Sequence, residues 1–387
     1  MLDLPLHISP LRVALVYNQK KEHATKQSAP DDASEPPSFD SIDSPTVDSQ
    51  TLSHPSFQHV TDLHAEWDTF ETIDAVRSAL AEIHDVSLVE ADEHAFEKLR
   101  ADRPDIVFNV AEGLYGVSRE AQMPAILEML QIPYTGSDPL TLALCLDKSR
   151  AKEILAYHHI PTPKFSVITS PVEIDSAAVT FPSIVKPLHE GSSKGIFNSS
   201  LVRNKAELAR EVVPVIEKYN EPALIEEYLG GREFTVAMLG NGDSVKVLPI
   251  VEIQFDSLPK GVNPIYSYEA KWVWDRSDAP LDIFQCPARI PSALQSEIES
   301  ICRMAYSVLR CRDWCRIDVR LDENGKPHIL ELNPLPGILP NPEDNSCFPK
   351  AARAAGISYN QLLQTVLALA AGRYGLVGVD STLQPTM

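Results

Sequence analysis

The residues best suited to metal and phosphate chemistry lie in two short segments near the C-terminus. Residues 316–321 (RIDVRL) and 328–333 (HILELN) alternate polar and apolar side chains, which is the period of a half-buried β-strand. Asn324-Gly325 lies between them and favours a tight hairpin turn, because both residues tolerate positive φ angles. The sequence therefore predicts a β-hairpin whose polar side chains share one face.

A symmetric turn places Asp318 opposite Glu331 on that face. It also places Arg316 opposite Asn333. Two carboxylates that face each other repel, so a cation is expected between them. With oxygen ligands only, this cation should be hard, with Mg²⁺ as the first choice. The alternative interpretation is a solvated polar face on an edge hairpin, which the rigid segment 333–337 (NPLPG) after the second strand disfavours.

A second candidate site is the segment 191–195 (GSSKG), which follows a predicted strand that ends at Lys186. Small residues let backbone N–H groups approach phosphate oxygens, and serine hydroxyls add further donors. The segment matches neither the Walker pattern nor G-x-G-x-x-G, so alone it is weak evidence for phosphate binding. Lys148 and Lys186 are cations near predicted strand–helix junctions, although either one alone could equally be a surface lysine.

The overall composition excludes several classes of protein. A formal net charge of −20 over 387 residues argues against sequence-independent nucleic-acid binding and against docking on anionic membranes. No apolar run approaches the length of a membrane span, and the first residues do not resemble a signal peptide. The six cysteines lack the paired spacing of a zinc site, so we expect free thiols in a cytoplasmic protein.

The order of predicted elements indicates an α/β protein whose C-terminal part is α+β. Strands and helices alternate in the first 110 residues, which implies a Rossmann-like parallel sheet. We expect an N-terminal domain at 1–139, a central α+β subdomain at 140–229 and a mostly antiparallel C-terminal domain at 230–387. Residues from about 18 to 62 are rich in Ser, Pro, Asp and Thr, so we expect a disordered insertion there.

Six short motifs, taken in order, resemble the ATP-grasp superfamily and within it the D-alanine–D-alanine ligases. They are IPYTGS (132–137), KP with EGSS (186–187 and 190–193), REFTV (232–236), YEAK (268–271), RIDV (316–319) and ELN (331–333). The similarity runs from about Asp105 to the C-terminus. It implies an ATP-grasp fold: a Rossmann-like N-terminal domain, a small central subdomain and a C-terminal catalytic domain.

The resemblance also implies a role for each matching residue. Asp318, Glu331 and Asn333 would hold two Mg²⁺ ions, or Mn²⁺ in their place, on the phosphates of ATP. Arg316 and the backbone of Gly337 would stabilise a tetrahedral intermediate, and Ser192 and Lys271 would complete the catalytic set. The phosphates of ATP would be contacted by Lys148 and Lys186, by the serine loop with Glu190, Ser192 and Ser193, and by Lys271 of the capping loop. The adenine ring would be bound by Glu226, Glu227, Tyr228 and Leu229, and the ribose by Glu233.

The activity implied by this resemblance is ATP-dependent C–N bond formation between an acid and an amino acid, through an acyl phosphate and with release of ADP. Small-molecule substrates, a homodimer and a place in cell-wall peptidoglycan synthesis are expected on the same ground. Two alternatives remain open. One is an ATP-grasp kinase that stops at a phosphorylated product, and the other is a nucleotide-binding regulator without catalysis, which the retained metal ligands disfavour.

The substrate half of the sequence departs from the family pattern. Residues 17–22 (YNQKKE) stand where the dipeptide ligases carry an acidic Ser-x-Glu-type segment, and Trp272 stands where a tyrosine usually follows the capping-loop lysine. The loop after Gly337 is also longer. We therefore expect an altered pair of substrates. The candidate substrate-reading residues, each of which could equally be a helix cap or a surface residue, are Glu112, Arg119, Glu120 and Ser346.

Overall fold

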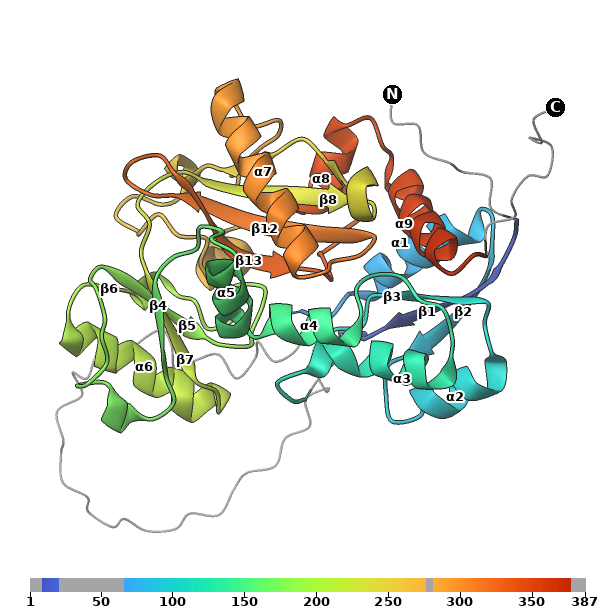
Figure 1. Ribbon diagram of the computed structural model, residues 1–387, viewed down its shortest axis with the longest axis horizontal. Coiled ribbons are helices and arrows are strands. Elements are labelled where there is room, and N and C mark those ends of the chain that lie inside the picture. The colour runs from blue at the N-terminus through green and yellow to red at the C-terminus, as the bar shows by residue number, and fades with distance from the viewer. Residues whose placement is uncertain (1–8, 21–65, 114, 276–280, 377–387) are drawn as a thin grey trace, which may run out of the picture.

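A parallel sheet forms the N-terminal part of the computed structural model, which describes residues 9–20, 66–113, 115–275 and 281–376 (Figure 1). The strand order is β2-β1-β3, and both pairings are parallel, as the alternation of strands and helices predicts. The strands are β1 (Arg12–Tyr17), β2 (Asp85–Glu90) and β3 (Ile106–Asn109). The helices are α1 (Phe70–Ala81), α2 (Ala95–Asp102) and α3 (Gln122–Leu130), the last preceded by a 3₁₀ turn at Arg119–Ala121.

A second, antiparallel sheet forms the central part of the chain. Its strand order is β4-β7-β5-β6, and α6 packs against β5, β6 and β7. The strands are β4 (Phe165–Ile168), β5 (Ser183–Pro187), β6 (Leu201–Val202) and β7 (Ala223–Glu227). The helices are α4 (Pro139–Leu146), α5 (Lys148–Tyr157) and α6 (Lys205–Tyr219). Asp138 and Asp147 cap α4 and α5, because each carboxylate accepts backbone N–H groups of the first turn.

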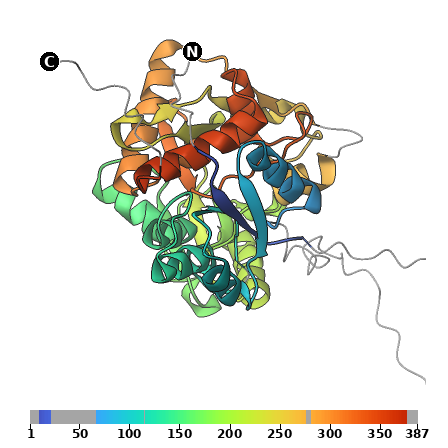
Figure 2. The same ribbon diagram turned by 90° about the vertical axis from the view of Figure 1, so that its right-hand side faces the viewer.

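The third sheet is antiparallel and forms the C-terminal part. Its strands follow the order β11-β10-β8-β12-β13, with β9 paired to β8. They are β8 (Glu233–Leu239), β9 (Lys246–Val247), β10 (Val251–Ile253), β11 (Phe284–Gln285), β12 (Trp314–Leu321) and β13 (Pro327–Asn333). The helices are α7 (Ser292–Val308), α8 (Cys347–Ala354) and α9 (Tyr359–Arg373). Helix α9 packs against α1 and so connects the C-terminal part with the N-terminal part (Figure 2).

Three features differ from the sequence-based expectations or fall outside the description. Helix α8 was not predicted, and the capping segment around Lys271 is a π-helix (Glu269–Trp274) rather than a loop. The predicted insertion begins too early, because Asn18 is buried and Gln19 forms a β-bridge with Asp68. The rest of that predicted segment, residues 21–62, lies outside the described residues.

The three sheets fall within residues 12–109, 165–227 and 233–333, so each lies inside one of the expected ranges, while the division into domains stays a prediction. All six cysteines are free thiols. Among the described helices, none has both the length and the apolar character that crossing a bilayer requires.

Candidate functional site

The hairpin β12–β13 pairs the residues that the sequence predicts. Asp318 lies opposite Glu331, and Arg316 lies opposite Asn333. The turn itself differs from the expected one, because Asp322 and Lys326 close a three-residue loop in which Gly325 has a φ of 78°. A β-bulge between the turn and the site restores the pairing. The prediction of the register at the site is therefore confirmed, and the prediction of a symmetric turn is wrong.

The side chains of the proposed metal set lie in contact with one another. Arg316 donates to Asp318 with N···O distances of 2.9 and 3.1 Å, and the Asn333 amide nitrogen lies 3.3 Å from the same carboxylate. Burial raises the pKa of Asp318. Burial alone would also raise the pKa of Glu331, but the charges of Lys148, Lys186 and Arg316 outweigh it and lower that pKa to about 2. An ionised Glu331 is therefore available as a ligand.

The donor set fits a hard cation, because two carboxylates and one amide oxygen are the ligands that Mg²⁺ prefers. Within the described parts of the chain, no group of three or more His, Cys, Asp or Glu side chains gathers that could hold a metal alone. Ions bound by Asp318, Glu331 and Asn333 would therefore need further oxygen atoms from phosphate or water.

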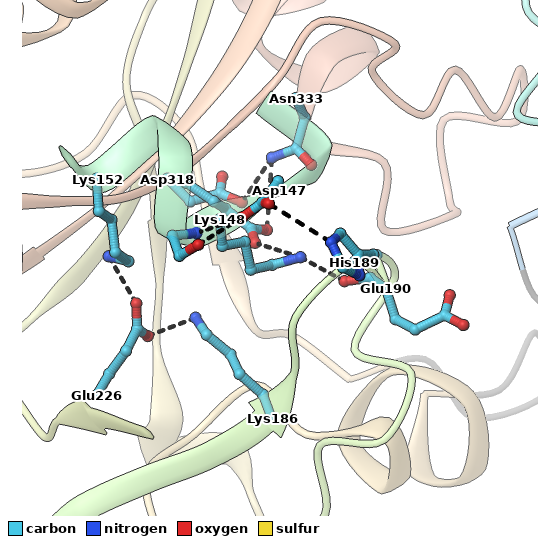
Figure 3. A network of polar contacts seen from close by, with 12 residues as sticks. Asp147, Lys148, Lys152, Lys186, His189, Glu190, Glu226, Asp318 and Asn333 are labelled. Atoms are coloured by element: carbon cyan, nitrogen blue, oxygen red, sulfur yellow. Dashed lines mark hydrogen bonds and ion pairs between the residues drawn. The ribbon is translucent and has the colours of Figure 1, made fainter. Parts of the chain in front are cut away.

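Three lysines take part in a network of polar contacts near this set (Figure 3). The carboxylate of Glu226 lies between two ammonium groups, 2.6 Å from Lys152 and 2.5 Å from Lys186. Lys148 donates to the carbonyl oxygen of Glu190 and lies 3.8 Å from Glu331. Burial lowers the pKa of Lys152 to about 8. Sequence analysis missed Lys152; its position one helical turn after Lys148 was the available signal.

The serine loop closes against the π-helix. Ser192 and Ser193 have φ angles of 51° and 60°, so their backbone curves in the left-handed region. Lys271 donates to the Ser192 hydroxyl at 3.2 Å, and the Trp272 indole donates to the Ser192 carbonyl at 3.1 Å. Burial and the charge of Arg316 lower the pKa of Lys271 to about 8. The loop and the π-helix therefore form a lid over the cleft.

The N-terminal part of the chain contacts this lid through Arg119. Its guanidinium donates to Glu66 at 2.7 Å, to Glu190 at 3.2 Å and to the His189 carbonyl at 2.8 Å. Glu66 in turn accepts the backbone N–H of Gly191 at 2.8 Å. Arg119 is thus engaged with the loop rather than open to a substrate. Sequence analysis did not single out Glu66, because its partners lie 53 and 125 residues away in the chain.

Two adjoining cavities meet at the lid. The larger, of about 250 Å³, is lined by Lys186, Tyr228, Glu233, Asp318 and Glu331 among others, and its apolar lining residues include Ile184 and Phe284. The smaller, of about 90 Å³, includes Glu112, Glu120 and Lys148. Both are lined by Glu66, Gly191, Ser192, Lys271, Arg316, Glu331 and Gly337.

The other expected site residues lie around these cavities. Glu226, Glu227 and Leu229 line the larger one beside Tyr228. Ser346 also lines it, and its hydroxyl bonds the Gly337 carbonyl at 3.1 Å and the Leu339 N–H at 3.2 Å. The structure therefore brings the expected nucleotide residues to one cleft.

Two glutamates of the smaller cavity have no partner. Glu112 and Glu120 make no hydrogen bond or ion pair within the described residues. Burial raises the pKa of Glu120 to about 7, and burial together with the charges of Glu120 and Glu66 raises that of Glu112. The smaller cavity therefore carries two carboxyl groups without a direct ion pair, and burial favours their neutral form although the charge of Arg119 opposes this shift for both.

A family model described as D-ala D-ala ligase C-terminus matches residues 154–368. The chain belongs to the D-alanine–D-alanine ligase family. A D-alanine–D-alanine ligase of Bordetella petrii is 34% identical over 289 residues, which cover 74% of this chain and 82% of the relative. An uncharacterized protein, y4sG, of Sinorhizobium fredii is 37% identical over 324 residues, 81% of this chain and 92% of that protein.

Solved structures agree with the fold. The crystal structure of a D-alanine–D-alanine ligase from Bacillus anthracis complexed with ATP superimposes with a TM-score of 0.65 and covers 95% of this chain and 99% of that one, at 22% identity. The ATP-grasp fold and the family membership expected from the motifs are therefore confirmed. As a D-alanine–D-alanine ligase family member, the protein is an ATP-dependent ligase.

Proposed function

We propose that the protein joins the carboxylate of one amino acid to the amine of a second substrate, through an acyl phosphate. The observation that carries this proposal is the meeting of the two cavities at Arg316 and Gly337. A nucleotide in the larger cavity and a carboxylate in the smaller one would approach each other at this point. Lys148 and Lys186 supply the local positive charge that an acidic protein needs to hold a triphosphate.

In the first step, a carboxylate oxygen of the substrate forms a bond to the γ-phosphorus while the bond to the ADP oxygen breaks. Lys148, Lys186 and the Ser192 loop hold the phosphates in line. Mg²⁺ bound by Asp318, Glu331 and Asn333 would neutralise phosphate charge. The lid excludes water, which would otherwise hydrolyse the acyl phosphate.

In the second step, the neutral amine forms a bond to the acyl carbon, the resulting oxyanion collapses as the bond from that carbon to the phosphate oxygen breaks, and inorganic phosphate leaves with the proton that the amine gives up. Arg316 and Gly337 line both cavities, so the guanidinium and the Gly337 backbone would stabilise this oxyanion. Lys271 lies beside Ser192 and lines both cavities, so its ammonium would contact the transferred phosphoryl group.

The two glutamates that line the smaller cavity indicate the class of the first substrate. Glu112 and Glu120 make no direct ion pair within the described residues, so an ammonium group in the smaller cavity would favour their ionised form and pair with them. An α-amino acid carries such an ammonium next to the carboxylate that Arg316 faces. The relatives' names make D-alanine the first candidate, and the altered substrate half makes other amino acids equally worth testing.

A panel assay tests this proposal. The protein is incubated with Mg·ATP and single or paired D- and L-amino acids, phosphate release is followed, and the products are identified by mass spectrometry. We expect ADP release that depends on an amine and yields a condensed product. Phosphate release without any condensed product would contradict the ligase assignment, and a stable phosphorylated product would show a kinase instead.

A further inference from the structure

Arg320 is a buried residue in the wall of the larger cavity. It follows Asp318 by two residues in β12, so both side chains project from the same face of the strand, and it pairs with Glu233 of β8. Only 3% of its surface is exposed, yet it lines the cavity. Two residues along a strand span about 7 Å, so Arg320 lies about 7 Å along β12 from Asp318. This is about the distance between the ribose and the phosphates of a bound nucleotide.

The guanidinium of Arg320 is held from three sides. It donates to Glu233 Oε2 at 2.6 Å, to the Tyr228 hydroxyl at 3.0 Å and to the Pro264 carbonyl at 2.7 Å. It also lies over the rings of Tyr228 and Phe255, with 4.8 and 5.2 Å to the ring centroids. A planar guanidinium between two aromatic rings keeps a single orientation.

This arrangement fixes Glu233. Its carboxylate is buried, and a buried carboxylate remains ionised at low cost only when a cation pairs with it. Arg320 supplies that cation and donates a hydrogen bond to Oε2 of Glu233. Oε1 of Glu233 accepts no hydrogen bond from the residues that the structure describes. Because an ionised carboxylate only accepts hydrogen bonds, its free oxygen requires donors from the ligand.

We propose that Arg320 is a positioning residue that holds Glu233 as the acceptor for the sugar hydroxyls of the nucleotide, and thereby sets a preference for ribonucleotides over 2′-deoxyribonucleotides. The proposal rests on the proposed function, because it takes the larger cavity as the ATP site. The sugar would lie at Glu233, two residues along the sheet from the level of Asp318, where the phosphates would be held. A nucleotide without the 2′-hydroxyl would leave one acceptor position of Glu233 unpaired.

Calorimetric titration with Mg·ATP and Mg·2′-deoxy-ATP, without amino acid, tests this inference directly. A hydrogen bond to a charged group corresponds to roughly tenfold or more in affinity, so the wild-type protein should bind ATP at least about tenfold more tightly than 2′-deoxy-ATP. Arg320→Met should weaken ATP binding about tenfold and 2′-deoxy-ATP binding much less, which brings the ratio towards one. Arg320→Lys should retain part of the preference for ATP over 2′-deoxy-ATP, because lysine keeps the positive charge but lacks the planar guanidinium.

Two further variants separate positioning from a general structural effect. Glu233→Gln should lower the ratio by itself, and adding Arg320→Met to it should change the ratio by less than about twofold. Arg232→Met removes another arginine–glutamate pair of the same sheet, that of Arg232 with Glu252, and should leave the ratio unchanged. The Arg232 side chain is not part of the cavity lining described by the structure.

An unaltered ratio in Arg320→Met, or equal weakening of both nucleotides, would overturn the inference. If Arg320→Met lacks a cooperative melting transition, Arg320→Lys decides: a wild-type ratio in that variant overturns the inference and a reduced ratio supports it. Failure of the wild-type protein to bind either nucleotide would overturn the proposed function as well, whereas ATP binding without sugar discrimination would overturn this inference alone.

Discussion

Asp318 lies directly opposite Glu331 across β12 and β13, although the turn between these strands holds an odd number of residues. From Leu321 to Val319 the pairing follows the three-residue turn, and the bulge after Ile329 then inserts Leu330 without a partner. Leu330 and Glu331 consequently both line the larger cavity, although they are neighbours in sequence. The bulge thus aligns the two carboxylates and adds an apolar group to the cleft wall.

Glu331→Gln should abolish turnover of Mg·ATP without unfolding the protein. The amide keeps the shape of the side chain but removes the negative charge that would hold a divalent cation opposite Asp318, so we expect a loss of roughly a hundredfold or more. Phosphate release measured at saturating ATP checks this expectation, with thermal melting as the test of the fold.

Glu323→Gln is the matched control, because Glu323 is an exposed glutamate in the turn of the same hairpin. It should retain wild-type turnover. Unchanged turnover in Glu331→Gln would show that this hairpin does not hold the metal.

Trp272→Phe should open the lid. The substitution removes the indole N–H that donates to the Ser192 carbonyl but retains an aromatic ring. Loss of about 1 kcal/mol raises the open population roughly fivefold, so more acyl phosphate should be lost to water. The ratio of phosphate released to condensed product measures this uncoupling. Val273→Ala, an exposed neighbour in the same π-helix, should keep the wild-type ratio; equal ratios in both variants would speak against a lid.

Stability should fall as the pH rises through about 9, because of His189. Burial disfavours the imidazolium, but Asp147 and Glu221, 3.6 and 3.5 Å away, outweigh it and raise the pKa to about 9 from an ordinary 6.5. This contribution is fully present below pH 6.5 and is lost as the pH passes the folded-state pKa, and it amounts to at most about 3 kcal/mol.

Denaturant unfolding at pH 6 and pH 10 measures this contribution. The difference in unfolding free energy between the two values should shrink in His189→Gln and persist in His94→Gln, which alters an exposed histidine. An identical difference in His189→Gln and wild-type protein would show that the imidazolium pair does not stabilise the fold.

Lys152→Met should lower both stability and ATP affinity. Glu226 is 3% exposed and would keep only Lys186 as a partner, so we expect a loss of roughly 2 kcal/mol, below the cost of a fully unpaired buried charge. The remaining attraction would hold Lys186 more firmly to Glu226 and away from the phosphates. Chemical denaturation and ATP titration measure the two effects. Lys164→Met, at an exposed position, is the control; equal behaviour of the two variants would remove Lys152 from the site.

The sequence by itself determined the features that depend on near neighbours. The period of two in residues 316–321, the turn chemistry of Asn324-Gly325 and the glycine-serine composition of 191–195 each act over a few residues, so they were readable without a structure. The order of six motifs then identified the family. The compensation between the three-residue turn and the bulge was not readable, because a bulge is set by packing on the neighbouring strand β8.

Only the tertiary structure decided which charges meet. Glu66 with Arg119, Arg320 with Glu233 and His189 with Asp147 come from separate elements, and long-range burial rather than local spacing brings each pair together. In the sequence these residues look like ordinary surface side chains, because a buried ion pair leaves no periodic pattern that could be recognised. The physical reason is that charge compensation follows desolvation, which exists only once the sheets and the lid have enclosed the cleft.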